Sequence, residues 1–174
     1  RGQSYNVVLT HIVADFDSLA AAVGVAKLWQ LQHPETPAYV VLPSGAHPSV
    51  ANFLSLHLEL FPIRGLGVLD PAGAKMVGVC DAQTRDRVGP ALEILDSAEE
   101  VHVYDHHVEK DSDLQNATVV IDNVGAVTTM ITELLQKEHG QAMMEVGGSS
   151  ILTEAEATLL ALGIHADTGK FWKI

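Results

Sequence analysis

The stretch Tyr5-Asn-Val-Val-Leu-Thr-His11-Ile-Val-Ala-Asp15-Phe-Asp17-Ser-Leu-Ala20 decides the fold. Its β-branched first half, Tyr5 to His11, predicts a buried strand. The amphipathic run from Ser18 to Gln32 predicts a helix that follows at once, with Asp17 as its N-cap. A strand that leads directly into a helix is typical of a parallel α/β sheet, in which sites form beyond the carboxyl ends of the strands.

The same alternation of short apolar runs and longer amphipathic runs continues along the chain. Its 174 residues suit one domain. We therefore expect a three-layer α/β fold with a mainly parallel, five-stranded sheet flanked by helices. Further strands are expected at Ala38 to Leu42, Met76 to Cys80, Val101 to Tyr104 and Thr118 to Ile121, and further helices at Pro48 to Leu58, Pro90 to Leu95, Gly125 to His139 and from the capping box at Thr153 towards Ile164.

The composition narrows the class of protein. Ten basic residues against 22 acidic residues give a net charge of −12, which excludes a simple basic nucleic-acid clamp. The charge does not exclude an enzyme in which metal ions supply local positive charge. A single cysteine, Cys80, excludes an internal disulfide framework and favours a reducing, cytoplasmic compartment. No apolar run approaches the ~20 residues of a membrane span.

Histidines and aspartates gather where the predicted strands end. Because the carboxyl ends of parallel strands share one edge of the sheet, these side chains are expected to meet there. His11 and Asp15 would lie ~13 Å apart in an extended chain, so the segment between them must curl. The strand-end residues are His11, Asp15, Asp17, Asp81, Asp105, His106 and His107, and Asp167 is expected just after the last helix.

Such crowding of carboxylates makes sense if cations occupy the cleft, since like charges raise each other's pKa. Imidazole combined with carboxylate, without thiolate, favours octahedral ions, and Mn²⁺ over Mg²⁺. So many candidate ligands suit two ions ~3.5–4 Å apart that share a carboxylate and a water. Taken one at a time, Asp17 could merely cap a helix, and Asp81 and Asp167 could merely form turns.

Together, these residues resemble the signature motifs of the DHH phosphoesterase superfamily. The motifs are His11-x-x-x-Asp15-x-Asp17, Asp81, Asp105-His106-His107 and the segment from Gly163 to Phe171, in the family's order. The stretches Asp15-Phe-Asp-Ser-Leu-Ala20, Asn52-Phe-Leu-Ser-Leu-His57 and Asp81-Ala-Gln-Thr-Arg-Asp-Arg87 are similar to a subgroup. In that subgroup the domain is joined to CBS domains and to a nucleotidyltransferase of the tRNA-CCA or poly(A) type.

The resemblance implies a role for each residue. His11 and Asp15 would bind a first ion, Asp17, His106 and Asp167 a second, and Asp81 would bridge them. His107 would touch the scissile phosphate or protonate the leaving oxygen, and Asp105 would orient an imidazole. Arg85 could contact phosphate or stabilise charge in the transition state, or it could form an ion pair with Asp86 or Glu93.

The resemblance also implies a phosphoesterase that uses Mn²⁺ or Mg²⁺ to hydrolyse phosphodiester bonds of nucleotides or short oligonucleotides. A pyrophosphatase or exopolyphosphatase would share the motifs, and a nucleotide-binding regulatory module is the alternative from another class. The family's smaller carboxyl-terminal domain, which completes the substrate site, is not expected within residues 1–174. Phe171 and Trp172 could be exposed there and allow a homodimer.

Overall fold

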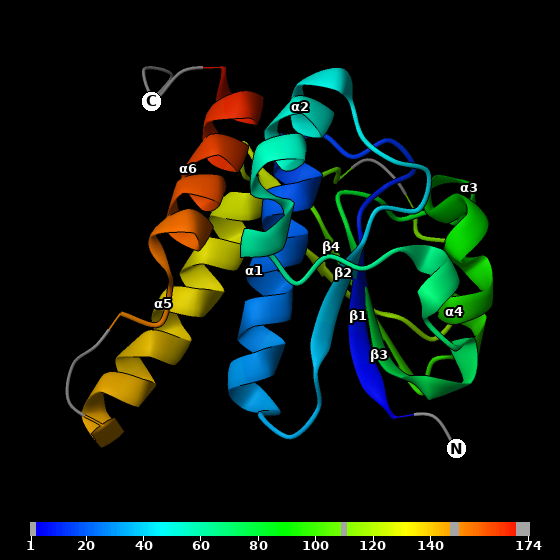
Figure 1. Cartoon of the computed structure of the whole chain (residues 1–174), viewed down its shortest axis with the longest axis horizontal. Helices are drawn as coiled ribbons and strands as arrows, with labels where there is room; N and C mark the ends of the chain where they lie inside the picture. Colours follow the sequence, from blue (N-terminus) through cyan, green and yellow to red (C-terminus); the bar gives the residue numbers. More distant parts are fainter. Residues whose placement is uncertain (1–2, 109–110, 147–149, 170–174) are drawn as a thin grey trace.

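A parallel sheet of five strands organises the computed structural model, which describes residues 3–108, 111–146 and 150–169. The strands lie in the order β2-β1-β3-β4-β5, and every neighbouring pair is parallel (Figure 1). This confirms the predicted α/β class and the five-stranded sheet. The strands are β1 (Tyr5–Leu9), β2 (Ala38–Val41), β3 (Ala74–Cys80), β4 (Glu100–Asp105) and β5 (Thr118–Ile121).

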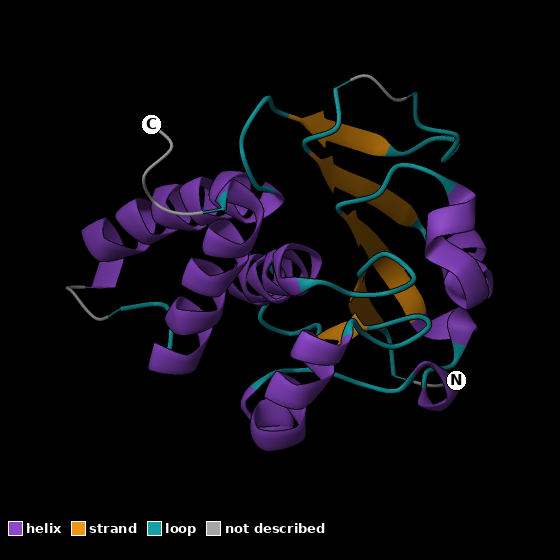
Figure 2. Ribbon diagram, turned by 90° about the horizontal axis from the view of Figure 1, so that it is seen from above, coloured by secondary structure: helices purple, strands orange, loops and turns teal. Residues whose placement is uncertain are grey.

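Helices flank the sheet on both faces, as Figure 2 shows from above. The short helices α3 and α4 cover one face, and α1, with α5 and α6 packed against it, covers the other (Figure 1). The stretch between α2 and β3, which shows no clear sequence pattern, forms short 3₁₀ turns. The helices are α1 (Phe16–Gln32), α2 (Pro48–His57), α3 (Arg85–Val88), α4 (Leu92–Ser97), α5 (Val127–Val146) and α6 (Glu154–Thr168).

The helix α1 is buried on nearly every side. It lies between the sheet and the α5–α6 pair (Figure 1), so small residues such as Ala20, Ala21 and Ala22 are fully enclosed. Trp29 anchors this larger core, which also includes Ile131 of α5. A second apolar cluster fills the space between the other face of the sheet and the helices α3 and α4. A helix enclosed in this way places the residues of its first turn deep in the molecule.

Two candidate site residues occupy different helix positions from those predicted. Asp15, not Asp17, is the N-cap of α1: its backbone is extended, and its carboxylate accepts the Ser18 N–H while the Ser18 hydroxyl completes a capping box. Asp17 therefore lies inside the first turn. Asp167 lies in the last turn of α6 rather than after the helix, which ends at Gly169 in the left-handed conformation. Within the described residues, no helix is long and apolar enough to cross a membrane.

Candidate metal centre

The turn after β1 brings His11 and Asp15 together. Ala14 holds the curl, because its N–H donates to the Gly45 carbonyl and its carbonyl accepts the His47 N–H. His11 is buried, and its Nε2 lies 3.4 Å from Asp15 Oδ2. Since Asp15 Oδ1 caps α1, the oxygen that faces His11 is the one left over. The curl predicted from the spacing of the two residues is confirmed.

Asp81 follows β3 directly and lies between two imidazoles. Its φ of +60° is left-handed, a conformation that Asp tolerates better than most residues. Its N–H donates to the Tyr104 carbonyl at 2.9 Å, which extends the β3–β4 ladder by one residue. Oδ2 then lies 3.6 Å from His11 Nε2, and Oδ1 lies 3.4 Å from His106 Nε2. One carboxylate thus faces two imidazoles through different oxygens, as a bridging carboxylate can.

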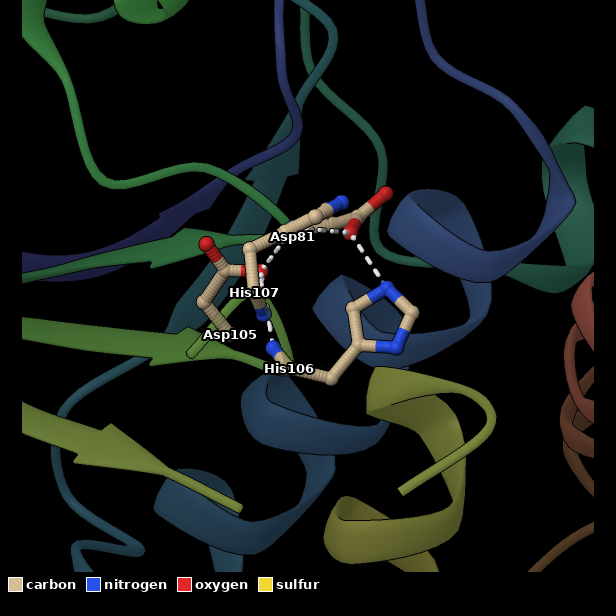
Figure 3. Close-up of side chains that lie close together, drawn as sticks. All are labelled: Asp81, Asp105, His106 and His107. Atoms are coloured by element: carbon tan, nitrogen blue, oxygen red, sulfur yellow. Dashed lines mark hydrogen bonds and ion pairs between the residues drawn. The ribbon is translucent and has the colours of Figure 1, made fainter. Parts of the chain in front are cut away.

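The end of β4 fixes two histidine rings in different ways (Figure 3). His106 Nδ1 lies 3.0 Å from the Val124 carbonyl. Because a carbonyl only accepts, Nδ1 carries a proton, which leaves Nε2 as the nitrogen that would bind a metal ion once its own proton is displaced. His107 Nδ1 lies 2.6 Å from Oδ1 of the buried Asp105, which also accepts the His106 N–H. The His107 side chain is 45% exposed, so this ring stands at the open side of the centre.

The ligand-type atoms of the centre fall into three overlapping groups. The first group is His11, Asp15 and Asp81, and the second group is Asp17, His106 and Asp167; within each group one atom from every residue lies within 4.8 Å of the others. In the second group, His106 Nε2 lies 3.7 Å from Asp167 Oδ2. Asp81 also groups with Asp105, His106 and His107.

The pKa values of the carboxyl groups shift in opposite directions, because burial and like charge raise them whereas hydrogen bonds lower them. Burial acts to raise the pKa of Asp15, but hydrogen bonds, the one with His11 foremost, lower that pKa to about 2. Burial raises the pKa of Asp17 to about 6 in spite of the hydrogen bonds this carboxylate accepts. Burial, followed by repulsion from Asp81, raises the pKa of Asp167. The second group therefore carries the acidic residues that resist ionisation.

The imidazole between these carboxylates is correspondingly basic. The contact with the Asp81 carboxylate, 3.4 Å away, raises the pKa of His106 to about 9, against the effect of burial. For Asp105, burial acts to raise the pKa, but hydrogen bonds from His107 and Gln83 outweigh it and leave the pKa below its ordinary value. A cationic side chain is thus favoured at the position where a metal ion would lie.

The centre fits the divalent cation that its donor set suggests. Among the described residues, buried side-chain atoms without a hydrogen-bond partner are His11 Nδ1, Asp81 Oδ1, Gln83 Oε1 and Asp105 Oδ2. Buried polar atoms are normally paired, and Asp81 Oδ1 makes only ion-pair contacts with described residues, such as that with His106 Nε2 at 3.4 Å, so it is a place where a cation would satisfy the structure. Imidazole and carboxylate are the donors, which suits Mn²⁺ or Mg²⁺.

Arg85 is not brought into either group. Its guanidinium makes a bidentate pair with Asp96 of α4, at 2.6 and 2.8 Å. The backbone N–H of Arg85 donates to Asp113 Oδ1. The ion-pair interpretation is therefore the one the structure shows, with Asp96 in place of Asp86 or Glu93. The one-turn helix α3 directs this side chain towards α4 rather than towards the sheet edge.

Three groups that hold the centre together were not predicted from the sequence. Thr128 binds Asp17 through its hydroxyl, the Val124 carbonyl fixes His106, and Gln83 Nε2 donates to the His107 carbonyl at 2.7 Å. A backbone carbonyl leaves no signal in a sequence, and Thr128 reads as an ordinary helix residue. Gln83 stands two residues after Asp81 and is 2% exposed, which is unusual for glutamine.

Fold and site together define an α/β protein with a His- and Asp-rich centre at the carboxyl edge of a parallel sheet. The family model described as DHH family, N-terminal domain, matches residues 6–164. The chain therefore belongs to the DHH family, as its motifs indicate. Asp167 lies beyond the matched range, and the last two residues of the motif segment, Lys170 and Phe171, lie outside the described residues.

Two relatives carry the name A-adding tRNA nucleotidyltransferase. The protein from Geobacter sulfurreducens is 32% identical over 166 residues, and the one from Aquifex aeolicus is 30% identical over 165 residues. These matches cover 94% and 95% of this chain but only 17% of each relative. The names of these relatives agree with the resemblance of the sequence to DHH domains that are joined to a tRNA nucleotidyltransferase.

Solved structures share the fold at lower identity. An exopolyphosphatase-related protein from Bacteroides fragilis aligns with a TM-score of 0.72 and 16% identity, over 97% of this chain and 47% of that one. A candidate family II inorganic pyrophosphatase from Methanococcus jannaschii aligns with a TM-score of 0.61 and 21% identity, over 94% and 48%. These likenesses establish the arrangement of the sheet and helices.

Proposed function

We propose that the chain is a divalent-metal-dependent phosphoesterase that hydrolyses phosphodiester bonds of nucleotides or short oligonucleotides. The observation that carries the proposal is the position of Asp81, whose two oxygens face His11 and His106, one from each group. Bound at the two groups, two Mn²⁺ or Mg²⁺ ions would lower the pKa of a shared water and neutralise charge on the phosphoryl oxygens.

The ligands divide as the two groups do. His11 and Asp15 would hold one ion, Asp17, His106 and Asp167 the other, and Asp81 would serve both. The Val124 carbonyl would keep His106 in the ligand tautomer throughout. The net charge of −12 is compatible with a phosphate substrate only because positive charge is supplied locally at this edge.

His107 is the residue that we propose as the proton donor to the leaving oxygen. Its Nδ1 is held by Asp105 at 2.6 Å, so Nε2 is the nitrogen that can reach a substrate. In the reaction, a water molecule would lose one proton to solvent as its oxygen forms a bond to phosphorus and the ester P–O bond breaks. The leaving oxygen takes the proton from His107 Nε2, while Asp105 stabilises the ring in its charged form before transfer.

The names of the relatives favour a nucleotide over pyrophosphate as substrate. Both relatives are called tRNA nucleotidyltransferases, and their shared segment is the length of this chain. The structural neighbours named for polyphosphate or pyrophosphate are 16% and 21% identical, which supports the fold alone. Comparing the turnover of a dinucleotide with that of pyrophosphate, at equal Mn²⁺, distinguishes the two substrates.

The proposal includes a second, smaller domain that completes the substrate cleft in the intact protein, and a cytoplasmic location in keeping with the buried, unpaired Cys80. The chain covers less than half of each structural neighbour named above, at 47% and 48%, which leaves room for such a domain. A homodimer stays a prediction, since Phe171 and Trp172 lie outside the described residues, and light scattering tests it.

The deciding experiment is Mn²⁺-dependent hydrolysis of a dinucleotide by the intact protein and by its Asp81→Asn variant. We expect the variant to lose metal-dependent turnover, because it removes the charge shared by both groups. Arg85→Lys is the matched control: it alters a charged residue on the same segment that lies outside both groups. Unchanged turnover in Asp81→Asn would refute the assignment. Tight nucleotide binding without hydrolysis in the wild type would favour a regulatory module instead.

A further inference from the structure

The carboxylate of Asp17 is held by a different helix from the one that carries it. Asp17 belongs to α1, yet both of its oxygens are bonded by the first residues of α5. Val127 N–H donates to Oδ2 at 2.8 Å, Thr128 N–H donates to Oδ1 at 2.9 Å, and the Thr128 hydroxyl donates to Oδ1 at 2.6 Å. All of these groups are buried, with Asp17 and Thr128 both fully enclosed.

The two backbone contacts have a structural explanation. Ala126, which precedes α5, has no side-chain acceptor for the free N–H groups at the start of the helix. Asp17 fills that role from α1, and any residue at position 128 other than proline would still supply the same N–H. Capping of α5 therefore does not require the Thr128 hydroxyl, so its bond to Asp17 needs a different explanation.

The hydroxyl determines which oxygen of Asp17 remains open. A carboxylate oxygen has two lone pairs, and Oδ1 already accepts two donors from Thr128. Oδ2 accepts one donor, from Val127, and so retains one lone pair. Because rotation of the carboxylate would break the bonds to Thr128, the free lone pair is fixed in direction. Asp17 is grouped with His106 and Asp167, which is where a ligand oxygen is required.

The same hydroxyl also lies against the helix that carries Asp167. A Cβ placed on Gly163 of α6 would lie 2.6 Å from Thr128 Oγ1 and 2.5 Å from Ala20 Cβ. Gly163 precedes Asp167 by four residues, so the two share one face of α6. Thr128 Oγ1 thus lies where α1, α5 and α6 meet, and it contacts the two helices that supply carboxylates to the second group.

We infer that Thr128 is a positioning residue for the second cation: its hydroxyl fixes the orientation of the Asp17 carboxylate, which is grouped with His106 and Asp167. The inference rests on the proposed function, because it presumes that the second group binds a metal ion. It assigns no contact between Thr128 and the ion or the substrate. Partners of this kind, which orient a ligand without touching the metal, typically change metal affinity by ~10- to 100-fold when removed.

The test is Mn²⁺ titration calorimetry on the metal-free chain and on paired variants of Thr128. Thr128→Val keeps the branched shape and both N–H contacts but removes the hydroxyl, whereas Thr128→Ser keeps the hydroxyl. We expect two ions in the wild type, and in Thr128→Val one ion of unchanged affinity and a second bound about 10- to 100-fold more weakly. Thr128→Ser is expected to restore the second ion.

Thr132→Val is the matched control. Thr132 lies one turn further along α5, and its hydroxyl donates at 2.8 Å to the Thr128 carbonyl rather than to a carboxylate. Its loss should leave both ions bound. Mn²⁺ electron paramagnetic resonance gives a second readout, because a coupled pair of ions in the wild type should give way to isolated ions in Thr128→Val. Thermal unfolding of each metal-free variant separates loss of the ion from loss of the fold.

The outcomes separate this inference from the proposed function. Two tight ions in both the wild type and Thr128→Val would overturn the inference and leave the proposed function standing. Absence of Mn²⁺ binding by the wild type would overturn both. If Thr128→Val does not fold, the pair Thr128→Ser and Thr128→Ala differs by the hydroxyl oxygen alone. Equal affinity of that pair for the second ion would then overturn the inference.

Discussion

The two halves of the candidate metal centre are assembled in different ways. The first group joins His11 and Asp15, which lie in one short turn, to Asp81 at the end of the adjacent strand. The second group joins Asp17, His106 and Asp167, which come from α1, the end of β4 and the last turn of α6. Two of the three ligands in the first half lie in one turn, whereas the second half depends on how α6 packs against α1 and the end of β4.

This difference determines what each half is sensitive to. The first group requires a turn that the hydrogen bonds of Ala14 and the Asp15 cap hold in place. The second group requires α6 to lie close to α1, which a glycine at position 163 permits. We therefore expect changes in helix packing to remove one ion and leave the other.

The largest expected effect is the loss of a single ion from a variant of a single ligand. Asp15→Asn should abolish the first ion, and because Asn is as good an N-cap as Asp, α1 should keep its start. Asp167→Asn should abolish the second ion. Mn²⁺ titration calorimetry on both variants measures this, and each serves as the control for the other. Loss of both ions in either variant would mean that the two groups are one indivisible site.

Gly163→Ala should break the second group by separating α6 from α1. The added Cβ would lie 2.5 Å from Ala20 Cβ and 3.1 Å from the Phe16 carbonyl oxygen, so the helices must move apart. We expect the free energy of unfolding to fall by about 1–3 kcal/mol, and the second ion to bind more weakly than the first.

Gly140→Ala is the matched control, measured by urea unfolding beside Gly163→Ala. It lies in α5, and an added Cβ there meets nothing within 4 Å. Replacing an exposed helical glycine with alanine should stabilise the chain, by up to about 1 kcal/mol. If both alanine variants stabilise the chain, the close approach of α6 is not what holds the second group.

The features that the sequence predicts are those formed by neighbouring residues, and the features that it misses are contacts between separate elements. The five strands and the curl between His11 and Asp15 follow from local apolar patterns and from chain length over a short gap. Asp17 was expected to cap its own helix, but it caps α5 instead, and no local pattern encodes a partner 110 residues away. The pairing of Arg85 with Asp96, only 11 residues away, was missed because it depends on how α3 and α4 lie relative to each other.

The pH dependence of the metal-free chain should distinguish the two groups. The pKa of His106 is raised to about 9 from 6.5, so the stability it contributes is complete below pH 6.5 and is lost as the pH rises through 9. The pKa of Asp15 is lowered to about 2 from 3.8, so its contribution is present above pH 3.8 and is lost as the pH falls towards 2.

Unfolding by urea in the presence of a chelator, from about pH 2 to about pH 10, measures both limbs. His106→Gln should flatten the alkaline limb alone, and Asp15→Asn the acid limb alone. Asp17 acts in a separate window: with its pKa raised to about 6, it costs stability as the pH rises from 3.8 to 6. An alkaline limb that persists in His106→Gln would show that another group governs the second half of the centre.

The smallest expected effect comes from the far end of α6. Thr153 accepts the Glu156 N–H at 3.2 Å, and the Glu156 carboxylate accepts the Thr153 N–H at 2.8 Å. Thr153→Ala should lower the free energy of unfolding by about 1 kcal/mol, with Thr153→Ser as the control that keeps the cap. Both ions should still bind with wild-type affinity, because the Gly163 contact, and not the start of the helix, sets the position of Asp167. If the second ion binds more weakly in Thr153→Ala but not in Thr153→Ser, the stability of α6 as a whole controls the second group. The second group would then depend on whether α6 forms, and not on how closely α6 packs against α1.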